Sequence, residues 1–249
     1  MKKNKDKLIY GRHPVIDALN SGKPIDKLLL QQGVRGDFER DIRHLSKRLN
    51  IPMQVVPKER LNHLTSGNHQ GIIGFLSLLT YQRIENVLPM IYEQSESPLL
   101  VLLHGVPDVR NFGAIARSAE CCGAHALVIP KKGVAQINAE ALKSSAGALT
   151  EIPVCREQSL IQAIEQLQLA GVEVLASSLR ATKAIDELDL TGPVALVVGS
   201  EGLGVSAPVL AKVDQQFIIP QKGKTDSFNV SVASGIMLYE VMRQRRLSH

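Results

Sequence analysis

Apolar runs and amphipathic helical patterns alternate along most of this chain, and that alternation restricts the fold more than any other feature. The runs Leu99–Leu103 and Val194–Val198 are continuously apolar, which is typical of parallel strands covered on both faces. Four further strands are predicted at 126–129, 152–154, 172–176 and 217–219, with helical patterns between them. We therefore predict an α/β domain over residues 99–249 with a mostly parallel, doubly covered sheet.

The first 82 residues show a smaller version of the same alternation. Strand patterns at 8–10, 27–30, 53–56 and 72–79 alternate with helical patterns near 14–22, 38–49 and 58–64. A stretch of this length is expected to form a separate α/β/α domain over 8–82. Residues 1–7 are expected to be a basic tail. Residues 83–98 are expected to link the two domains, because residues 94–98 form a polar spacer; within this link residues 84–92 could form a short helix, which Pro89 would limit.

Positive charge is concentrated in the first part of the chain. Residues 1–82 hold 14 Lys and Arg and 7 Asp and Glu, a net charge of +7, whereas the remaining residues have a net charge of −2. A basic module joined to a near-neutral one suggests a polyanion-binding domain attached to a second function. A basic tail alone is the alternative explanation. His13 and His69 are interpreted as structural or RNA-facing residues rather than catalytic ones.

The composition argues against several classes of site. Aromatic residues make up 4% of the chain and Trp is absent, which disfavours an aromatic platform for stacking bases. The three cysteines show no C-x-x-C spacing, so neither a zinc site nor a disulfide framework is expected. We expect no metal and no membrane partner, because no apolar run is long enough to cross a bilayer. A cytoplasmic location is expected.

Three polar loops follow predicted strands, at 104–111, 199–204 and 220–229. Ligands of parallel sheets bind beyond the carboxyl ends of the strands, where these loops would lie. The glycines at 199, 202 and 204 do not fit the dinucleotide pattern G-x-G-x-x-G. Gly223-Lys224-Thr225 resembles the end of a P-loop, but Ile218 stands where the first glycine is required. A nucleotide-using α/β enzyme is therefore disfavoured.

Arg117 interrupts an otherwise apolar helical pattern that begins near Asn111. An arginine on a buried face needs an anionic partner. That partner could be a nearby carboxylate such as Glu120 or Glu201, or a phosphate or reacting hydroxyl of a ligand; the pattern alone does not separate these.

Taken together, the three loops resemble the SpoU/TrmH family of the SPOUT superfamily, which are RNA ribose 2′-O-methyltransferases. The two-part arrangement is closest to the bacterial 23S rRNA guanosine subgroup, whose first domain resembles the ribosomal L30e-type fold. The family's first motif falls on Asn111, Gly113 and Arg117. The second and third fall on Gly199, Glu201, Gly204, Ile219, Pro220, Gly223, Ser227, Asn229, Val230 and Ser231. Three positions depart from the usual pattern: Val109, Gln221 and Phe228.

The resemblance implies a deep trefoil knot, a homodimer and S-adenosylmethionine as cofactor. By resemblance, the catalytic residues are Arg117, Asn111, Glu201, Ser227 and Asn229, and the cofactor contacts are Gly199, Ile219 and Phe228. The implied reaction is methylation of a ribose 2′-hydroxyl, a group that only RNA carries.

The role of Arg117 stays open between a base and a phosphate clamp. Bringing an arginine from its ordinary pKa of ~12.5 to near 7 costs about 7 kcal/mol, which favours the clamp. Two alternatives to the guanosine assignment also stay open: a non-catalytic rRNA-binding or assembly protein, and a resistance-type 23S rRNA adenosine 2′-O-methyltransferase.

Overall fold

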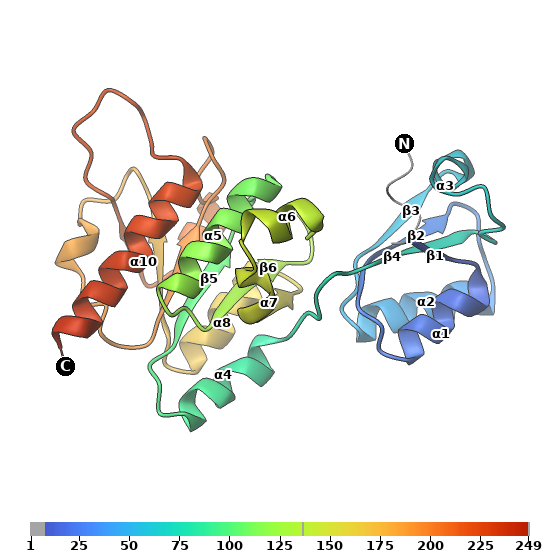
Figure 1. Ribbon diagram of the computed structural model, residues 1–249, viewed down its shortest axis with the longest axis horizontal. Helices are drawn as coiled ribbons and strands as arrows, with labels where there is room; N and C mark the ends of the chain where they lie inside the picture. Colours follow the sequence, from blue (N-terminus) through green and yellow to red (C-terminus); the bar gives the residue numbers. More distant parts are fainter. Residues whose placement is uncertain (1–7, 136, 249) are drawn as a thin grey trace. The chain divides into compact units, whose positions relative to one another are not determined.

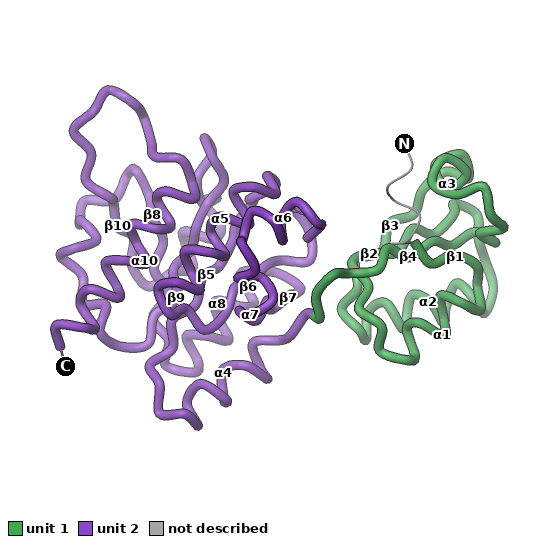
Figure 2. The backbone as a smooth tube through the Cα atoms, in the orientation of Figure 1, with its two compact units in different colours: residues 1–80 green, residues 81–249 purple. Residues whose placement is uncertain are grey.

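The computed structural model describes residues 8–135 and 137–248, so the predicted basic tail lies outside the described residues. The chain divides into two compact units, with the boundary between Thr80 and Tyr81 (Figure 2). Each unit has its own sheet and its own core, and each is described separately below. No helix in the described part of the chain is both long and apolar enough to cross a membrane.

The first unit is a four-stranded sheet with helices on both faces. Its strand order is β1-β4-β2-β3, in which β2 and β3 run parallel and β4 runs antiparallel to both β1 and β2. The elements are β1 (Leu8–Tyr10), α1 (Arg12–Asn20), β2 (Ile25–Gln31), α2 (Asp37–Arg48), β3 (Met53–Val56), α3 (Lys58–Leu64) and β4 (Ile72–Leu76). The predicted α/β/α arrangement of this unit is confirmed.

The two faces of this sheet bury different residues of the same strands, because successive side chains of a strand point to opposite faces. Leu28 and Leu30 of β2 pack with α1 and α2 in one cluster, which includes Val15 and Ile42. Leu29 packs in a second cluster that includes Leu61 of α3. Helices α1 and α2 therefore cover one face and α3 covers the other (Figure 1).

His69, in the loop between α3 and β4, links the stability of the first unit to pH. Its side chain is buried, and burial lowers its pKa below 6.5, with a further contribution from Lys58. Unfolded His has a pKa of ~6.5, so the unfolded chain takes up the proton first. We expect stability to be greatest above pH 6.5 and to fall below it. Chemical denaturation at pH 7.5 and 5.5 should show a larger loss for the wild type than for His69→Gln; equal losses would contradict this explanation.

The second unit is a six-stranded sheet in which every neighbouring pair is parallel, in the order β10-β8-β9-β5-β6-β7. This confirms the predicted parallel sheet. The strands are β5 (Leu99–Leu103), β6 (Ala126–Pro130), β7 (Val154–Glu157), β8 (Glu173–Ser177), β9 (Val194–Val198) and β10 (Gln215–Phe217). The helices are α4 (Ile84–Glu93), α5 (Val109–Cys121), α6 (Ala139–Ser144), α7 (Ala148–Glu151), α8 (Leu160–Leu169), α9 (Ala207–Leu210), α10 (Val230–Leu247) and the short 3₁₀ helix η2 (Ile185–Glu187).

Both faces of this sheet are buried, as its continuously apolar central strands predict. Leu100 and Leu102 of β5 pack in one cluster with apolar residues of α4, α8 and α9. The opposite face is covered by α5 and α10, which pack against each other (Figure 1). Phe112 of α5 and Met237 of α10 are fully buried there. The sheet thus holds α5 and α10 side by side, and both helices begin at the end of the sheet where the polar loops lie.

The expectation that residues 83–98 form a linker is wrong. This segment contains α4, which belongs to the core of the second unit. The apolar residues Ile84, Val87, Leu88 and Ile91 recur at helical spacing and are all buried. Pro89 lies inside the helix on its exposed side. Burial of the apolar stripe therefore outweighs the hydrogen bond that a proline cannot donate.

The last strand also differs from its predicted bounds. β10 ends at Phe217 rather than at residue 219, because its partner β8 ends at Ser177. Beyond that point the backbone of Ile218 bonds instead to Lys183 and Ile185. The chain then runs through an irregular loop to Asn229 (Figure 1).

Arg245 anchors the end of α10 to two distant loops. Its guanidinium donates hydrogen bonds to the carbonyl oxygens of Ser97 (2.8 Å), Pro98 (2.9 Å) and Gly192 (2.7 Å). Hydrogen bonds to a charged group contribute more than neutral ones, and Arg245→Met would leave these carbonyls without that donor. We expect Arg245→Met to lower the free energy of unfolding by about 3 kcal/mol, measured by urea denaturation. Arg246→Met, at the exposed neighbouring position, is the matched control and should change it little.

Candidate active site

Three residues from separate loops meet at the carboxyl end of the second sheet. Asn111 donates a hydrogen bond from Nδ2 to Oε2 of Glu201 (3.4 Å). Asn229 donates from Nδ2 to Oδ1 of Asn111 (3.2 Å) and to Oε1 of Glu201 (3.3 Å). Asn111 and Asn229 are separated by 118 positions in the sequence. The structure therefore brings together one predicted site residue from each of the three motifs.

Helix capping fixes the two asparagines. Asp108 caps α5 by accepting hydrogen bonds from the backbone amides of Arg110 and Asn111. Asn229 caps α10 by accepting from the amide of Ser231 (3.0 Å). The amino ends of two helices thus meet beside the Glu201 carboxylate. Each helix end carries a partial positive charge, so this position favours a negative group.

A cavity of about 440 Å³ adjoins this trio. Its wall is formed by segment 198–207 and the segment after β8, by residues from the first turns of α10, and by residues of the loop before α10, namely Ile218, Ile219, Gln221, Ser227 and Phe228. The predicted contacts Gly199, Ile219, Ser227 and Phe228 all line it, as does Glu201. A cavity of this size, with main-chain groups along one wall and apolar side chains along another, suits a small organic ligand.

Gly199 is required by the close approach of two backbone segments. A Cβ atom at this position would lie 2.2 Å from the carbonyl carbon of Gly204. The loop closes on itself through the paired backbone hydrogen bonds of Ser200 and Gly204. No side chain can be accommodated there without displacing the loop that forms the cavity wall.

Gly113, in the first motif, is explained by packing. A Cβ atom here would lie 2.6 Å from Cβ of Ser144 and 2.7 Å from the carbonyl oxygen of Ala141, because α6 crosses α5 at this point. Gly113 therefore allows α6 to pack closely against α5, and it lines neither of the cavities beside Glu201.

A second cavity, of about 520 Å³, shares Glu201 and neighbouring loop residues with the first. Asn111, Asp108 and His104 line it, and burial lowers the pKa of His104. Neither His104 as a site residue nor this cavity was predicted from the sequence. The available signal was the position of His104, directly after the buried strand β5, where ligand-facing residues commonly occur.

Arg117 lies apart from the trio within one chain. Its side chain is exposed and forms no hydrogen bond or ion pair with the residues that the structure describes. The prediction that Arg117 lies on a buried face is therefore wrong, and of the two partners left open, the carboxylate pairing is not observed. Six residues along a helix correspond to a rise of about 9 Å and a rotation of about 240° relative to Asn111, so Arg117 lies on a different side of α5.

Comparison with known proteins identifies the chain. Residues 98–239 match the SpoU rRNA Methylase family, and residues 8–82 match a domain described as RNA 2′-O ribose methyltransferase substrate binding. The chain belongs to the SpoU methylase family. It is accordingly an RNA 2′-O-methyltransferase, and members of the SpoU family use S-adenosylmethionine as the methyl donor.

Individual SpoU relatives resemble the whole chain or about two thirds of it. A TrmH family tRNA/rRNA methyltransferase of Bacillus subtilis (strain 168) is 33% identical over 238 residues, which is 95% of each chain. The SpoU methyltransferase AviRb from Streptomyces viridochromogenes, solved with the cofactor AdoMet, shares the fold with a TM-score of 0.61 at 23% identity, covering 97% of this chain and 91% of that one. A TrmH/SpoU tRNA modifying enzyme of A. aeolicus is 31% identical with a TM-score of 0.55, covering 66% of this chain and 85% of that one.

Proposed function

We propose that this SpoU protein methylates the 2′-hydroxyl of a guanosine in 23S rRNA, in the cytoplasm. The observation that carries the proposal is the hydrogen-bonded meeting of Asn111 and Asn229 with Glu201, which lines both cavities, in a chain whose other unit matches an RNA substrate-binding domain. The choice of 23S rRNA and guanosine rests on the two-part resemblance described above.

The 440 Å³ cavity is the proposed cofactor site. The residues present fit S-adenosylmethionine, because Gly199 keeps backbone groups of the loop accessible and Phe228 and Met237 supply apolar contacts. When bound, the cofactor supplies an electrophilic methyl group on a sulfonium. Ile219 and Phe228 would hold its adenosyl part through main-chain groups.

Among the described residues, no group of three His, Cys, Asp or Glu side chains is placed to hold a metal ion.

Methylation requires the ribose hydroxyl to lose its proton while its oxygen becomes more nucleophilic. The carboxamides of Asn111 and Asn229 meet beside Glu201, which lines both cavities, and there they would orient the ribose. Ser227 lines the cofactor cavity and would contact the RNA ribose or phosphate. Glu201 holds both carboxamides in place by accepting a hydrogen bond from each.

Glu201→Gln tests this positioning role. Glutamine keeps the size of the side chain but replaces one acceptor oxygen with a donor, which would face the donor of an asparagine. Loss of a charged hydrogen bond costs about 1.5–3 kcal/mol, so we expect kcat to fall roughly 10- to 100-fold with little change in cofactor affinity. Glu93→Gln, at an exposed position on α4, is the control. Wild-type kcat in Glu201→Gln would remove Glu201 from the catalytic arrangement.

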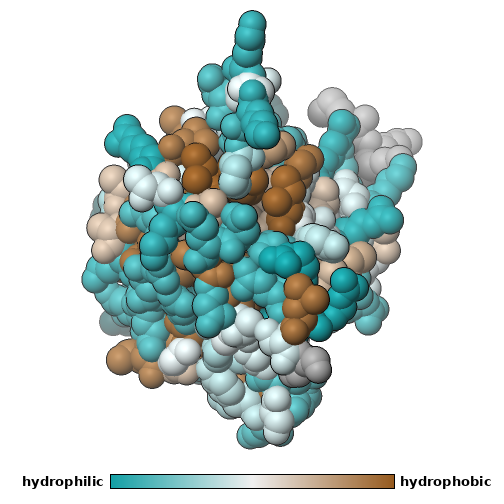
Figure 3. All heavy atoms as spheres, turned by 90° about the vertical axis from the view of Figure 1, so that its left-hand side faces the viewer, coloured by the Kyte–Doolittle hydropathy of each residue, from teal (hydrophilic) through white to brown (hydrophobic). Residues whose placement is uncertain are grey.

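We further propose that the protein acts as a homodimer and that Arg117 reaches the active site of the partner subunit. Arg117 is exposed on α5, next to α10, whose Val232 and Tyr239 are half exposed. The end of the unit that carries α10 shows apolar groups among hydrophilic ones (Figure 3). A second copy covering this surface would bury the apolar side chains and bring in a guanidinium. A trefoil knot formed by the C-terminal segments is part of the same proposal.

The target is tested by mapping ribose methylation in rRNA and tRNA from cells with and without the gene. Loss of one 2′-O-methylguanosine in 23S rRNA, restored by the gene, is the expected result. A lost methyl group on an adenosine of 23S rRNA would indicate the resistance-type enzyme. A lost methyl group in tRNA, or no change at any site, would contradict the proposed target.

A further inference from the structure

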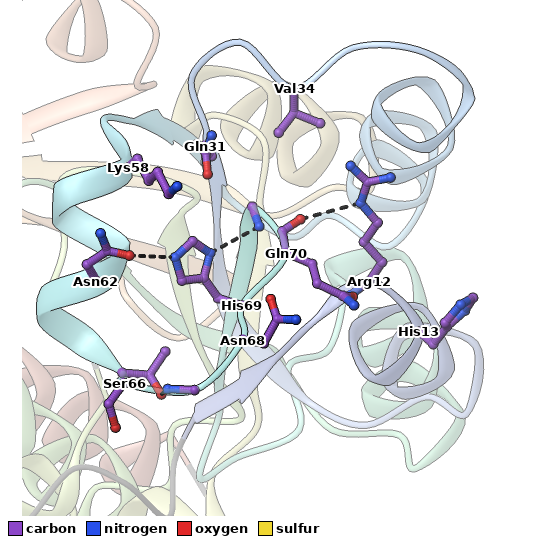
Figure 4. Close-up of a pocket in the computed structure, with 13 residues that line it drawn as sticks. Arg12, His13, Gln31, Val34, Lys58, Asn62, Ser66, Asn68, His69 and Gln70 are labelled. Carbon is purple, nitrogen blue, oxygen red and sulfur yellow. Dashed lines mark hydrogen bonds between the residues drawn. The ribbon is translucent and has the colours of Figure 1, made fainter.

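The first unit contains an open cleft of about 780 Å³ for which the catalytic mechanism has no use. Three segments form it: the start of α1 at Arg12, the end of β2 at Gln31, and the stretch from α3 through the loop 65–71 (Figure 4). Its volume exceeds what one small ion needs and lies in the range of sites that hold organic ligands. The inference below rests on the proposed function, since it concerns the RNA substrate.

The floor of the cleft is held rigid by His69. Its Nδ1 accepts a hydrogen bond from the backbone amide of Gly71 (3.0 Å), so the ring proton is on Nε2. Nε2 donates to Oδ1 of Asn62 (2.9 Å), which leaves the amide nitrogen of Asn62 free to donate elsewhere. Figure 4 shows the carboxamide oxygen of Asn62 turned toward the His69 ring.

The loop over this floor is also fixed before any ligand binds. Gln70 accepts hydrogen bonds from Arg12 at its side-chain oxygen (2.9 Å) and at its carbonyl oxygen (3.4 Å), which joins the loop to α1. Gly67 lies against the ring of Tyr10, where a Cβ atom would be 2.5 Å from a ring carbon. A site that is already ordered loses little conformational entropy on binding.

The chemistry of the lining favours an anion that also carries hydrogen-bonding edges. None of the lining residues is acidic, whereas Arg12 and Lys58 are cationic. Four carboxamide side chains line the cleft, and that of Asn68 makes no hydrogen bond with the residues that the structure describes. Carboxamides carry both donors and acceptors and can match the edge of a base.

A flat surface for stacking is provided by Arg12. Its guanidinium lies over the ring of Phe38, 4.6 Å from the ring centre. This contact fixes the orientation of the guanidinium plane. Arginine planes can stack on unpaired bases in RNA recognition, so the cleft does not need an aromatic lining residue. In an RNA duplex the faces of the bases are covered by stacking and their major-groove edges are out of reach of side chains, so an unpaired base fits this cleft better than a paired one.

We propose that this cleft binds one unpaired nucleotide of the RNA substrate, with its base at the carboxamides of Asn62 and Asn68, stacked on Arg12, and its phosphate near Lys58. The first unit would thereby select single-stranded or looped RNA.

Binding of labelled RNA to the full chain tests this proposal without using methyl transfer. The probes are a random-sequence 12-nucleotide single strand and a 12-base-pair RNA duplex, followed by fluorescence anisotropy. We expect the single strand to bind about tenfold or more tighter than the duplex. Asn68→Leu should weaken single-strand binding about tenfold. Lys58→Gln should weaken binding and reduce the slope of log affinity against log salt concentration by about 1.

Matched substitutions elsewhere in the same unit serve as controls. Asn20→Leu and Lys47→Gln replace exposed residues outside the cleft and should leave binding unchanged. Neither Asn68 nor Lys58 makes a side-chain hydrogen bond within the described residues, so their variants should fold. Thermal unfolding checks this.

Three results would overturn the proposal. The first is equal affinity for the duplex and the single strand. The second is equal affinity of the cleft variants and the control variants for the single strand. The third is that inorganic polyphosphate displaces the labelled single strand as well as unlabelled single-stranded RNA does at equal phosphate concentration. The last would indicate an anion site only. Methyl transfer by wild-type protein with unaltered binding in the cleft variants would contradict this inference alone, whereas intact RNA binding with no methyl transfer to any RNA would contradict the proposed function.

Discussion

Arg117→Lys is expected to lose methyl transfer by about 100-fold or more while the fold and the cofactor affinity are retained. Lysine keeps the positive charge but lacks the planar fork that contacts a phosphate through two hydrogen bonds. Removing one well-placed group that stabilises developing charge typically costs 10²–10³ in rate. The side chain is exposed in one chain, so the substitution should not disturb packing. The measurement is kcat/KM for RNA, beside cofactor binding by calorimetry.

Arg110→Lys is the matched control for this substitution. Arg110 is also exposed on α5 and is paired with Glu140 at 2.8 Å, a contact that lysine can keep. Near-normal turnover by Arg117→Lys would remove Arg117 from the chemistry.

Mixing inactive subunits tests whether Arg117 acts across a dimer. If Arg117 serves the partner's site, a mixture of Arg117→Ala and Asn229→Ala chains should regain activity, because one site of each mixed dimer then holds both native residues. If Arg117 serves its own chain, every site in the mixture lacks either native Arg117 or native Asn229, and the mixture should stay inactive.

Gly199→Ala is expected to abolish measurable cofactor binding. The added methyl group would overlap the Gly204 backbone at 2.2 Å, and backbone atoms cannot rotate away as a flexible side chain can. Relief of such an overlap requires the loop 199–205 to move, at a cost of about 1–3 kcal/mol or more, and this loop forms a wall of the cofactor cavity. Calorimetric titration with S-adenosylmethionine measures the effect.

Gly192→Ala is the control, because a Cβ atom at Gly192 would meet open space and its carbonyl can still accept from Arg245. Cofactor affinity within about threefold of the wild type in Gly199→Ala would mean that the 440 Å³ cavity is not the cofactor site.

Several local features of the fold were predictable because they depend on short-range chemistry. Asn229 belongs to a residue type that favours helix starts, and it begins α10 because its side chain satisfies an otherwise unpaired amide at the first turn. The apolar run Val194–Val198 was expected to be a covered strand and is buried at every position. Where local patterns conflicted, the prediction failed: the polar spacer at 94–98 suggested a linker, but four apolar residues at helical spacing placed α4 in the core.

The sequence by itself determined the two α/β units and the parallel character of the second sheet. It also determined which three loops contribute residues to the site. These features depend on periodicity and capping, which act over a few residues. Only the tertiary structure decided that Glu201 bonds to Asn111 and Asn229, and that Arg117 faces outward instead. The cleft around His69 was also decided there, since Arg12 and Gln70 are 58 positions apart. Such contacts depend on strand order and on the rotation of each helix about its axis, and local periodicity specifies neither.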